Sequence, residues 1–249
     1  MSKRSRPNSR HLPKGLEVIY EDRALLVVDK PPGLLTIGTE TEKSRTAYSA
    51  LTDYVRKGSA RSKNRIFIVH RLDRDTSGIL IFAKSEEAKF YLQSQWRETK
   101  KKYLAVAHGT FEKRSGIITS YLAENKAHTV YSTGNTTKGK LSHTGYRVLK
   151  QTRHFALLEV DLLTGRKHQI RVHLADHGHP IVGDKKYGNR NPSHKRIALH
   201  ALSLSVRHPT SGAMCTFETN VPEYFNRLVG SLGQGDTQRT NAMGSQTHR

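Results

Sequence analysis

The sequence is poor in cysteine and in long apolar runs, and both absences exclude classes of protein. Its 249 residues contain one cysteine, Cys215, which excludes an intramolecular disulfide framework and a zinc site built from cysteines. No apolar run reaches the roughly 20 residues that a bilayer-spanning helix needs. The basic start of the chain is not followed by an apolar segment, as it would be in a secretory signal. These absences predict a cytoplasmic protein.

Acidic residues are also scarce relative to basic ones. The chain has 21 Asp and Glu against 42 Lys and Arg, which gives a formal net charge of +21. This excess is not confined to the ends of the chain. A surface of this charge attracts polyanions and binds them with a strong dependence on salt. The composition therefore predicts a nucleic-acid partner, but it does not separate DNA from RNA or an enzyme from a packaging protein.

The chain is polar overall, with 35% hydrophobic residues and a mean hydropathy of −0.65, which indicates that part of it lies outside a packed core. Residues 1–14 carry five basic residues and no acidic one, so they predict a basic flexible arm. Residues 233–249 lack apolar periodicity and predict a disordered tail. Between them we expect one domain over residues 15–232, because no long linker or internal repeat interrupts the sequence.

The apolar patterns predict an α+β fold. Strand-like runs rich in Val, Ile, Leu and Tyr end at turn residues, and four further stretches have helical character. Strands outnumber helices and do not alternate with them as a doubly wound sheet requires. Ser85, with two acidic residues in the turn that follows, predicts the start of the second helix. The predicted strands are 16–20, 24–29, 66–70, 78–84, 102–107, 146–149, 155–162 and 197–206, and the predicted helices are 46–57, 85–99, 167–177 and 221–231.

The segment His70-Arg-Leu-Asp-Arg-Asp-Thr-Ser-Gly78 lies between two apolar strands, which predicts a loop presented by a sheet. Asp73 stands between Arg71 and Arg74, and a cationic neighbour favours the ionised form of a carboxylate. An ionised carboxylate on a loop supported by strands suits a nucleophile or a base. The alternative is an aspartate that caps a turn and pairs with arginine for structure.

A second segment, Leu163-Thr-Gly-Arg-Lys-His-Gln-Ile-Arg-Val-His-Leu174, reads as a turn followed by a helix. Arg166, Lys167 and Arg171 are expected at the start of that helix, where backbone N–H groups already attract anions. Such cations hold a phosphate or pair with a carboxylate from elsewhere in the chain. The alternative is an ordinary basic helix face.

A third segment places Lys100, Lys101 and Lys102 directly before a strand whose first aromatic residue is Tyr103. A tyrosine beside cations can accept a proton or stack on a base. The alternative is a core tyrosine.

These three segments, in this order, resemble the signature of the RluA-type pseudouridine synthases. The opening block YEDRALLVVDKPPGLLT and the closing blocks HGHPIVGDKKYG and RIALHALSLSVRHP resemble blocks of the same family. The resemblance covers roughly residues 16–220. Larger members of the family often carry an amino-terminal RNA-binding domain of the S4 type, and here only about 15 residues precede the core, so we expect that domain to be absent.

The resemblance assigns roles to individual residues. It implies that Asp73 is the catalytic aspartate, that Tyr103 is the active-site tyrosine, and that Arg171 pairs with the catalytic carboxylate. It also implies that Arg71 reaches toward the space left by a flipped nucleotide and that Ile170 packs against the target base. The predicted substrate-binding residues are Arg71, Arg74, Lys102, Arg166, Lys167, His168 and Ile170.

The resemblance also implies a fold and a reaction. The fold is a curved, mainly antiparallel mixed sheet flanked by helices, with the active site in a basic cleft. The reaction isomerises specific uridines of structured ribosomal or transfer RNA to pseudouridine, which requires no cofactor and no metal. We expect RNA as the partner, no membrane association, and a monomer.

Other interpretations stay open at this stage. An RNA-binding protein that keeps the fold without turnover has the same composition, and Asp73 with Asp75 has the spacing for a two-metal nuclease. Residues 134–141 nearly match a phosphate-binding loop but end in Leu141 instead of Ser or Thr. His173, His177 and His179 are spaced almost like metal ligands, although no HExxH motif accompanies them.

Overall fold

The computed structural model describes residues 12–57, 59, 61–188 and 193–230, and the chain divides into two compact units. Unit 1 comprises the chain up to Tyr103 together with 162–164 and 199–220, and unit 2 comprises 104–161, 165–198 and the chain from Val221. Most of the predicted arm and all of the predicted tail lie outside the described residues, so the boundaries at 14 and 232 stay predictions. None of the described helices has the length and apolarity to cross a membrane.

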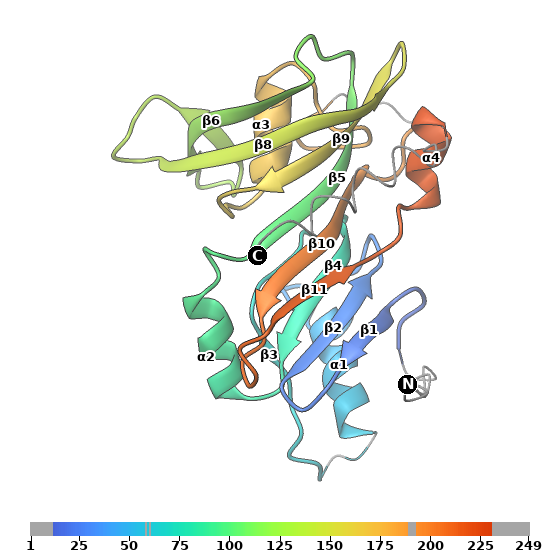
Figure 1. The fold of residues 1–249 in the computed structure, drawn as a ribbon, viewed down its shortest axis with the longest axis vertical. Coiled ribbons are helices and arrows are strands. Elements are labelled where there is room, and N and C mark those ends of the chain that lie inside the picture. Colours follow the sequence, from blue (N-terminus) through green and yellow to red (C-terminus); the bar gives the residue numbers. More distant parts are fainter. Residues whose placement is uncertain (1–11, 58, 60, 189–192, 231–249) are drawn as a thin grey trace, which may run out of the picture. The chain divides into compact units, whose positions relative to one another are not determined.

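Unit 1 is built on a sheet in which β1, β2, β4 and β10 lie side by side (Figure 1). Strand β3 pairs with β4, and β11 pairs with β10. The pairing of β4 with β10 is parallel, whereas β1 with β2, β2 with β4, β3 with β4 and β10 with β11 are antiparallel. The strands are β1 Glu17–Glu21, β2 Leu25–Lys30, β3 Phe67–Ile68, β4 Ser77–Ala83, β10 Leu199–Arg207 and β11 Met214–Glu218, and the helices are α1 Ala47–Arg56 and α2 Glu86–Ser94.

Local sequence explains where the unit 1 helices begin. Thr46 caps α1 by accepting the N–H of Ser49, and Ser85 caps α2 by accepting the N–H of Ala88, as predicted for Ser85. Apolar side chains of β2 and β4 point to both faces of the sheet and enter two core clusters. Both central strands are therefore fixed from both sides.

Gly78 explains how closely β4 approaches β10. Its φ is +108°, and a Cβ at this position would come 2.2 Å from the carbonyl oxygen of Ala201. Only glycine fits this contact. The close approach holds the start of β4, directly after the predicted catalytic loop, against β10.

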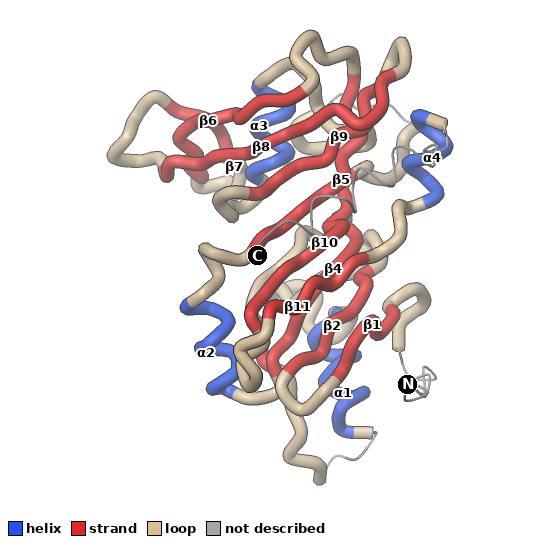
Figure 2. Tube along the Cα trace, viewed as in Figure 1, coloured by secondary structure: helices blue, strands red, loops and turns tan. Residues whose placement is uncertain are grey.

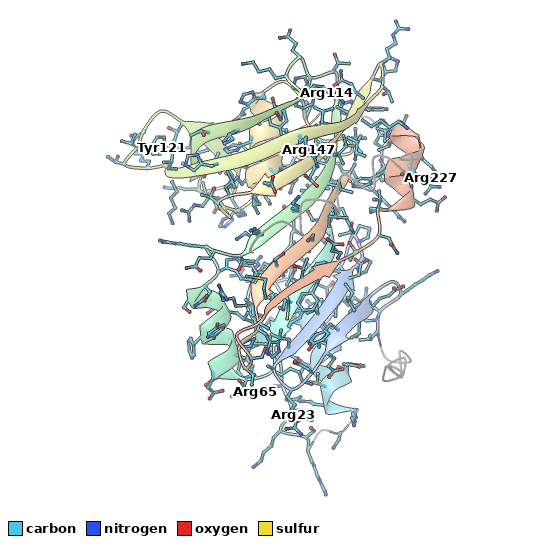
Figure 3. All side chains as sticks on the ribbon, in the orientation of Figure 1. Arg23, Arg65, Arg114, Tyr121, Arg147 and Arg227 are labelled. Carbon is cyan, nitrogen blue, oxygen red and sulfur yellow. The ribbon has the colours of Figure 1, made fainter. Side chains whose placement is uncertain are left out.

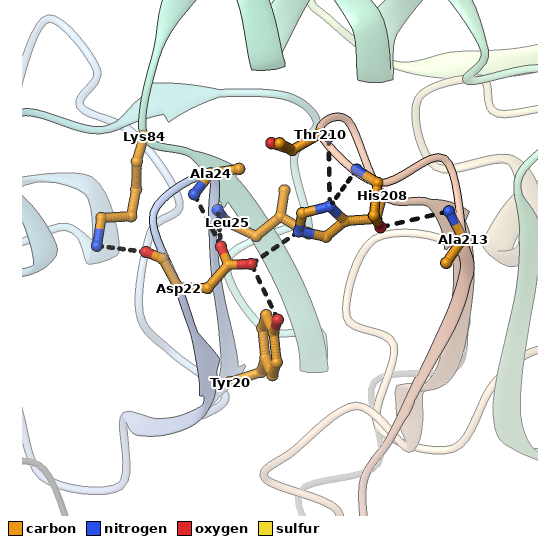
Figure 4. Close-up of polar contacts among 9 residues, drawn as sticks. Tyr20, Asp22, Ala24, Leu25, Lys84, His208, Thr210 and Ala213 are labelled. Carbon is orange, nitrogen blue, oxygen red and sulfur yellow. Dashed lines mark hydrogen bonds and ion pairs between the residues drawn. The ribbon is translucent and has the colours of Figure 1, made fainter.

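A polar network joins the turn before β2 to the β10–β11 turn (Figure 4). Asp22 accepts the N–H groups of Ala24 and Leu25 through Oδ1, and its Oδ2 lies 2.7 Å from Nε2 of His208. Nδ1 of His208 accepts backbone N–H groups from Thr210 and Ser211. Because Nδ1 is an acceptor, Nε2 carries the hydrogen that is donated to Asp22.

Unit 2 contains a second run of neighbouring strands in the order β5, β9, β8, β6 and β7. Strand β6 pairs antiparallel with both β7 and β8, and helix α3 contacts β6, β7 and β8 (Figures 1 and 2). The strands are β5 Lys100–His108, which begins in unit 1, β6 Ser115–Glu124, β7 Val130–Thr133, β8 Lys140–Gln151 and β9 Phe155–Leu162, and the helices are α3 Gln169–Asp176 and α4 Glu223–Val229.

The structure confirms the predicted α+β class and corrects the elements in several places. Strands β6, β7 and β11 were not predicted, and β8 is much longer than the predicted 146–149. The predicted strand at 66–70 shortens to Phe67–Ile68, and the predicted helix at 85–99 ends at Ser94. The predicted helix at 167–177 begins at Gln169, so Arg166 and Lys167 precede it instead of starting it.

Candidate active site

The Asp73 loop lies between β3 and β4, as predicted, and is bonded to the segment after β2. The N–H of Gly33 donates to the carbonyl of Arg74 over 2.9 Å. The buried hydroxyl of Thr36 donates to the carbonyl of Leu72 over 2.8 Å and accepts the N–H of the same residue. The loop is therefore positioned by backbone bonds on both sides of Asp73.

Lys30, at the end of β2, holds the same two segments together from inside the protein. Its side chain is fully buried, and Nζ donates to the carbonyls of Pro31, Leu34 and Arg74 at 2.9–3.0 Å. Burial lowers the pKa of Lys30 to about 7, against the opposing charges of Asp75, Asp73 and Asp29. Three carbonyl acceptors match the three N–H bonds of an ammonium group.

Lys30 was not among the site residues predicted from the sequence. The signal that points to it is its place at the end of a strand of apolar residues, directly before Pro31 and Pro32. A lysine in such a place is buried only where acceptors surround its ammonium group.

Tyr103 lies near Asp73 within unit 1. Burial, and then the charge of the Asp73 carboxylate, raise the pKa of the Tyr103 phenol well above its ordinary value. The same side chain packs against the core cluster that contains Leu72 and Leu80. Tyr103 is thus both a core residue and a neighbour of the predicted catalytic carboxylate, so the two sequence interpretations are compatible.

The predicted cations of unit 1 have different surroundings. Arg71 and Arg74 are exposed, and Nε of Arg74 donates to the carbonyl of Gly33 over 3.2 Å. Lys101 donates to the carbonyl of Trp96 over 2.9 Å, and burial lowers its pKa to about 8. Lys102 is half-buried, and its contact with substrate stays a prediction.

A buried histidine, which the sequence analysis did not single out, fixes the end of the Asp73 loop. Nδ1 of His200 lies 2.8 Å from the hydroxyl of Ser77, and Nε2 lies 2.6 Å from the hydroxyl of Thr219. Burial lowers the pKa of His200 to about 4, so the ring is neutral at physiological pH. This neutral ring ties β4 and β10 to the segment after β11.

Arg171 lies in α3 of unit 2 and forms a two-bond ion pair with Asp184. Nε donates to Oδ2 and Nη2 donates to Oδ1, each over 2.8 Å. The Asp184 side chain is 0% exposed and that of Arg171 is 13% exposed. Burial alone would raise the pKa of Asp184, but the bond to Arg171, the charge of Arg171 and two backbone N–H bonds together lower it.

The other predicted residues of unit 2 lie around the start of α3. Lys167 pairs with Glu124, and Nδ1 of His168 lies 2.7 Å from the hydroxyl of Tyr187. His168 has a left-handed backbone at φ +54° directly before the helix. Ile170 is buried in unit 2, at 4% exposure, and its contact with a base stays a prediction.

His173 takes part in a buried chain of hydrogen bonds. Nδ1 lies 2.9 Å from the hydroxyl of Thr144, and Nε2 lies 3.0 Å from the hydroxyl of Ser120. Burial lowers its pKa to about 4. Across the part of the chain that the structure describes, no three His, Cys, Asp or Glu side chains gather as a metal site would need.

The predicted catalytic residues are therefore distributed between the units. Asp73 and Tyr103 lie in unit 1, and Arg171 lies in unit 2. The pairing of Arg171 with Asp73 stays a prediction.

Comparison with known proteins decides the family. The family model described as RNA pseudouridylate synthase matches residues 24–176, which is more than half of the chain. The chain belongs to this family. The family predicted from the sequence is thereby confirmed. The description of the family names its enzyme class as RNA pseudouridine synthase. The matched residues include Asp73, Tyr103 and Arg171.

Bacterial relatives that bear the name ribosomal large subunit pseudouridine synthase D include those of Nitrosomonas europaea and Pseudomonas aeruginosa. The protein of Nitrosomonas europaea is 37% identical over 228 residues, which cover 87% of this chain and 65% of the relative. The chain thus spans slightly less than two thirds of that relative. The protein of Pseudomonas aeruginosa is 35% identical over 238 residues, which cover 88% of this chain and 72% of the relative.

Solved structures give the same fold. Human RNA pseudouridylate synthase domain containing 1 matches with a TM-score of 0.73 and 26% identity over the whole of both chains. Human RNA pseudouridylate synthase domain containing 4 matches with a TM-score of 0.69 and 23% identity, over 84% of this chain and 89% of that one. The pseudouridine synthase fold that the sequence predicted is confirmed.

Proposed function

We propose that this protein isomerises uridine to pseudouridine in structured RNA, with Asp73 as the reacting carboxylate. The observation that carries the proposal is the Asp73 loop, which a buried lysine and a buried threonine bond to the segment after β2. Such a loop holds a carboxylate in one place, as a reacting group requires. The names of the bacterial relatives favour ribosomal RNA as the substrate over transfer RNA.

The proposed reaction conserves the atoms of the nucleotide. The bond between N1 of uracil and C1′ of ribose breaks, the base turns, and a bond forms between C5 and C1′. The hydrogen at C5 leaves as a proton, and N1 gains one, so no oxidant or cofactor is needed. Asp73 attacks C1′ or the uracil ring, or helps to remove a ribose proton. The base reaches it by leaving the stack or from a single strand.

Tyr103 contributes as a neutral phenol in this proposal. Its raised pKa keeps the hydroxyl protonated at physiological pH, which favours stacking and hydrogen-bond donation over proton acceptance. The aromatic ring offers a stacking surface for an extruded base.

The remaining predicted residues have proposed roles in orienting Asp73 and in binding RNA. We propose that Arg171 pairs with the Asp73 carboxylate and keeps it ionised. Ile170 and His168 would contact the base. The cations proposed to hold RNA backbone are Arg71, Arg74, Lys102, Arg166 and Lys167. We further propose that the protein acts on RNA as a monomer in the cytoplasm.

Tritium release from RNA made with 5-tritiated uridine tests this function. We expect release from ribosomal RNA in the presence of EDTA, because no metal takes part, and none from the Asp73→Asn variant. RNA cleavage that EDTA blocks would instead indicate a nuclease. RNA binding without release by the wild-type protein would indicate a binding protein that has lost turnover.

A further inference from the structure

We propose that Asp184 is a positioning residue, which aims the guanidinium group of Arg171 from inside unit 2. The inference rests on the proposed function, because it concerns how Arg171 meets the reacting carboxylate. Asp184 lies beyond the residues that the family model matches and was not among the site residues predicted from the sequence. Its side chain is fully buried, so it acts on substrate only through another residue.

The hydrogen bonds of Asp184 fix the plane of the guanidinium group. Arg171 donates Nε and Nη2 to the two carboxylate oxygens, each over 2.8 Å. A two-bond pair of this kind defines both the position and the plane of an arginine head group. The backbone N–H groups of Lys186 and Tyr187 donate to Oδ1 over 2.9 and 3.1 Å, so the carboxylate itself is anchored to the chain.

A tyrosine supports the guanidinium group from a second direction. Cζ of Arg171 lies 5.1 Å from the centre of the Tyr187 ring. The hydroxyl of Tyr187 accepts the N–H of Val130 over 3.1 Å and lies 2.7 Å from Nδ1 of His168. The ring is therefore held at its far end, and the arginine is supported both in its plane and on its face.

The backbone before Asp184 is shaped for this contact. Gly183 has φ +76°, and a Cβ there would come 1.9 Å from the carbonyl oxygen of Arg196. Only glycine permits such an approach. The turn that presents Asp184 is thus set by the chain and not by the ion pair alone.

The charge of Asp184 points to aiming rather than to RNA attraction. A carboxylate beside Arg171 reduces the positive potential that this part of unit 2 offers to RNA. If the pair served only to attract RNA, the aspartate would oppose that role. If Asp184 weakens RNA attraction but fixes the orientation of Arg171, its removal should affect RNA affinity and the reaction rate in different ways.

Asp184→Asn should slow the reaction without weakening RNA binding. We expect the single-turnover rate of tritium release to fall by roughly tenfold to a hundredfold, because displacements of about 1 Å at a reacting centre have effects of this size. RNA affinity should stay the same or increase, since a negative charge is lost. Weaker RNA binding together with an unchanged single-turnover rate would overturn the proposal.

Glu159→Gln is the matched control. Glu159 is a buried carboxylate of the same unit, at 4% side-chain exposure, and it accepts a bond of 2.9 Å from Arg147, labelled on β8 in Figure 3. The substitution removes the same charge from a similar ion pair. We expect a lower melting temperature and a wild-type reaction rate. If Glu159→Gln slows the reaction as much as Asp184→Asn does, the effect is one of general stability and the proposal fails.

A double-mutant cycle tests whether Asp184 acts through Arg171. If it does, adding Asp184→Asn to Arg171→Ala should leave the single-turnover rate within about twofold of the Arg171→Ala value. Independent, multiplicative losses would contradict the proposal. Arg171→Lys provides a second test that leaves Asp184 in place, because it keeps the charge but loses the two-bond fork. We expect it to be about as slow as Arg171→Ala, and a near-wild-type rate would overturn the inference.

The outcome for the wild-type protein separates this inference from the proposed function. If the wild-type protein releases no tritium, the proposed function fails. If the wild-type protein is active and Asp73→Asn is not, but Asp184→Asn and Arg171→Lys both react at the wild-type rate, the proposed function stands and the positioning role is refuted.

Discussion

Asp22 precedes strand β2 and Asp29 lies within it, and their carboxyl pKa values move in opposite directions. Asp29 is desolvated and faces Glu17 across the β1–β2 ladder, and these two effects raise its pKa to about 6. For Asp22, burial alone would raise the pKa, but the N–H groups of Leu25 and Ala24, with His208 and Tyr20, together lower it. The hydrogen bonds that Asp22 accepts therefore outweigh its burial, whereas burial dominates at Asp29.

Asp29→Asn should stabilise unit 1 at neutral pH. A pKa raised from 3.8 to about 6 means that the folded state binds more protons than the unfolded chain between these values. Its contribution to stability is present below pH 3.8 and is lost as the pH rises through 6. The melting temperature of the variant should exceed that of the wild type at pH 7.5, and the two should converge near pH 4. A lower melting temperature at pH 7.5 would contradict this account.

Asp22→Asn should have the opposite effect. Nε2 of His208 donates to Oδ2 of Asp22 (Figure 4). In Asp22→Asn an amide NH₂ group replaces this oxygen, so two hydrogen-bond donors would face each other. We expect a loss of about 1–3 kcal/mol in the free energy of unfolding at pH 7. The lowered pKa makes this stabilisation present above pH 3.8 and lost as the pH falls through the folded-state value. Urea unfolding of the wild type and of the variant at pH 7 and at pH 3 measures this loss and its dependence on pH. An equal loss in the free energy of unfolding at the two pH values would refute the proposed link to the Asp22 pKa.

Among the elements, the turn after β2 determines the position of the Asp73 loop through Lys30. Lys30→Met keeps the length of the side chain but leaves the carbonyls of Pro31, Leu34 and Arg74 without their donor. We expect faster hydrogen exchange over residues 72–76 and a single-turnover rate about tenfold lower. Lys43→Met, at an exposed position of the same unit, is the control and should show neither effect.

The elements also show why part of the fold escaped prediction. Strand β6 and the first half of β8 carry Ser120 and Thr144 toward α3, where they bond to His173 instead of packing as apolar residues. Ser120 also lies 3.0 Å from the hydroxyl of Ser132 on β7. Hydroxyl residues interrupt the apolar alternation on this face, with Ser120 between the buried Ile118 and Leu122 on β6 and with buried Ser142 and Thr144 on β8, so the pattern that reveals a strand was weak.

Short sequence motifs and their order predicted more of the site and the family than apolar periodicity predicted of the strands. The loop around Asp73, the cap at Ser85 and the family followed from short motifs whose residues have a local physical role. The sequence analysis assigned no role to Lys30 or Asp184. The carbonyl groups around Lys30 and the guanidinium group beside Asp184 come close to them only in the folded chain. A sequence shows that such residues are charged, but it does not show that they are buried.

The whole molecule carries a formal net charge of +21, and a charge of this size should make the proposed RNA binding depend on salt. We expect the logarithm of RNA affinity to fall steeply and linearly with the logarithm of salt concentration. Removal of residues 1–14, with their five basic side chains, should make that slope shallower without changing the rate at saturating RNA. An unchanged slope would show that these residues make no contact with RNA.

In the proposed reaction, one carboxylate on a loop fixed by the protein interior performs the isomerisation. The most direct measurement compares single-turnover tritium release by Asp73→Asn and by Asp75→Asn, which removes the same charge two positions along the loop. The account predicts that Asp73→Asn loses more than about a thousandfold in rate while still binding RNA. Asp75→Asn should stay within about tenfold of the wild type. Release by Asp73→Asn at the wild-type rate would contradict the account.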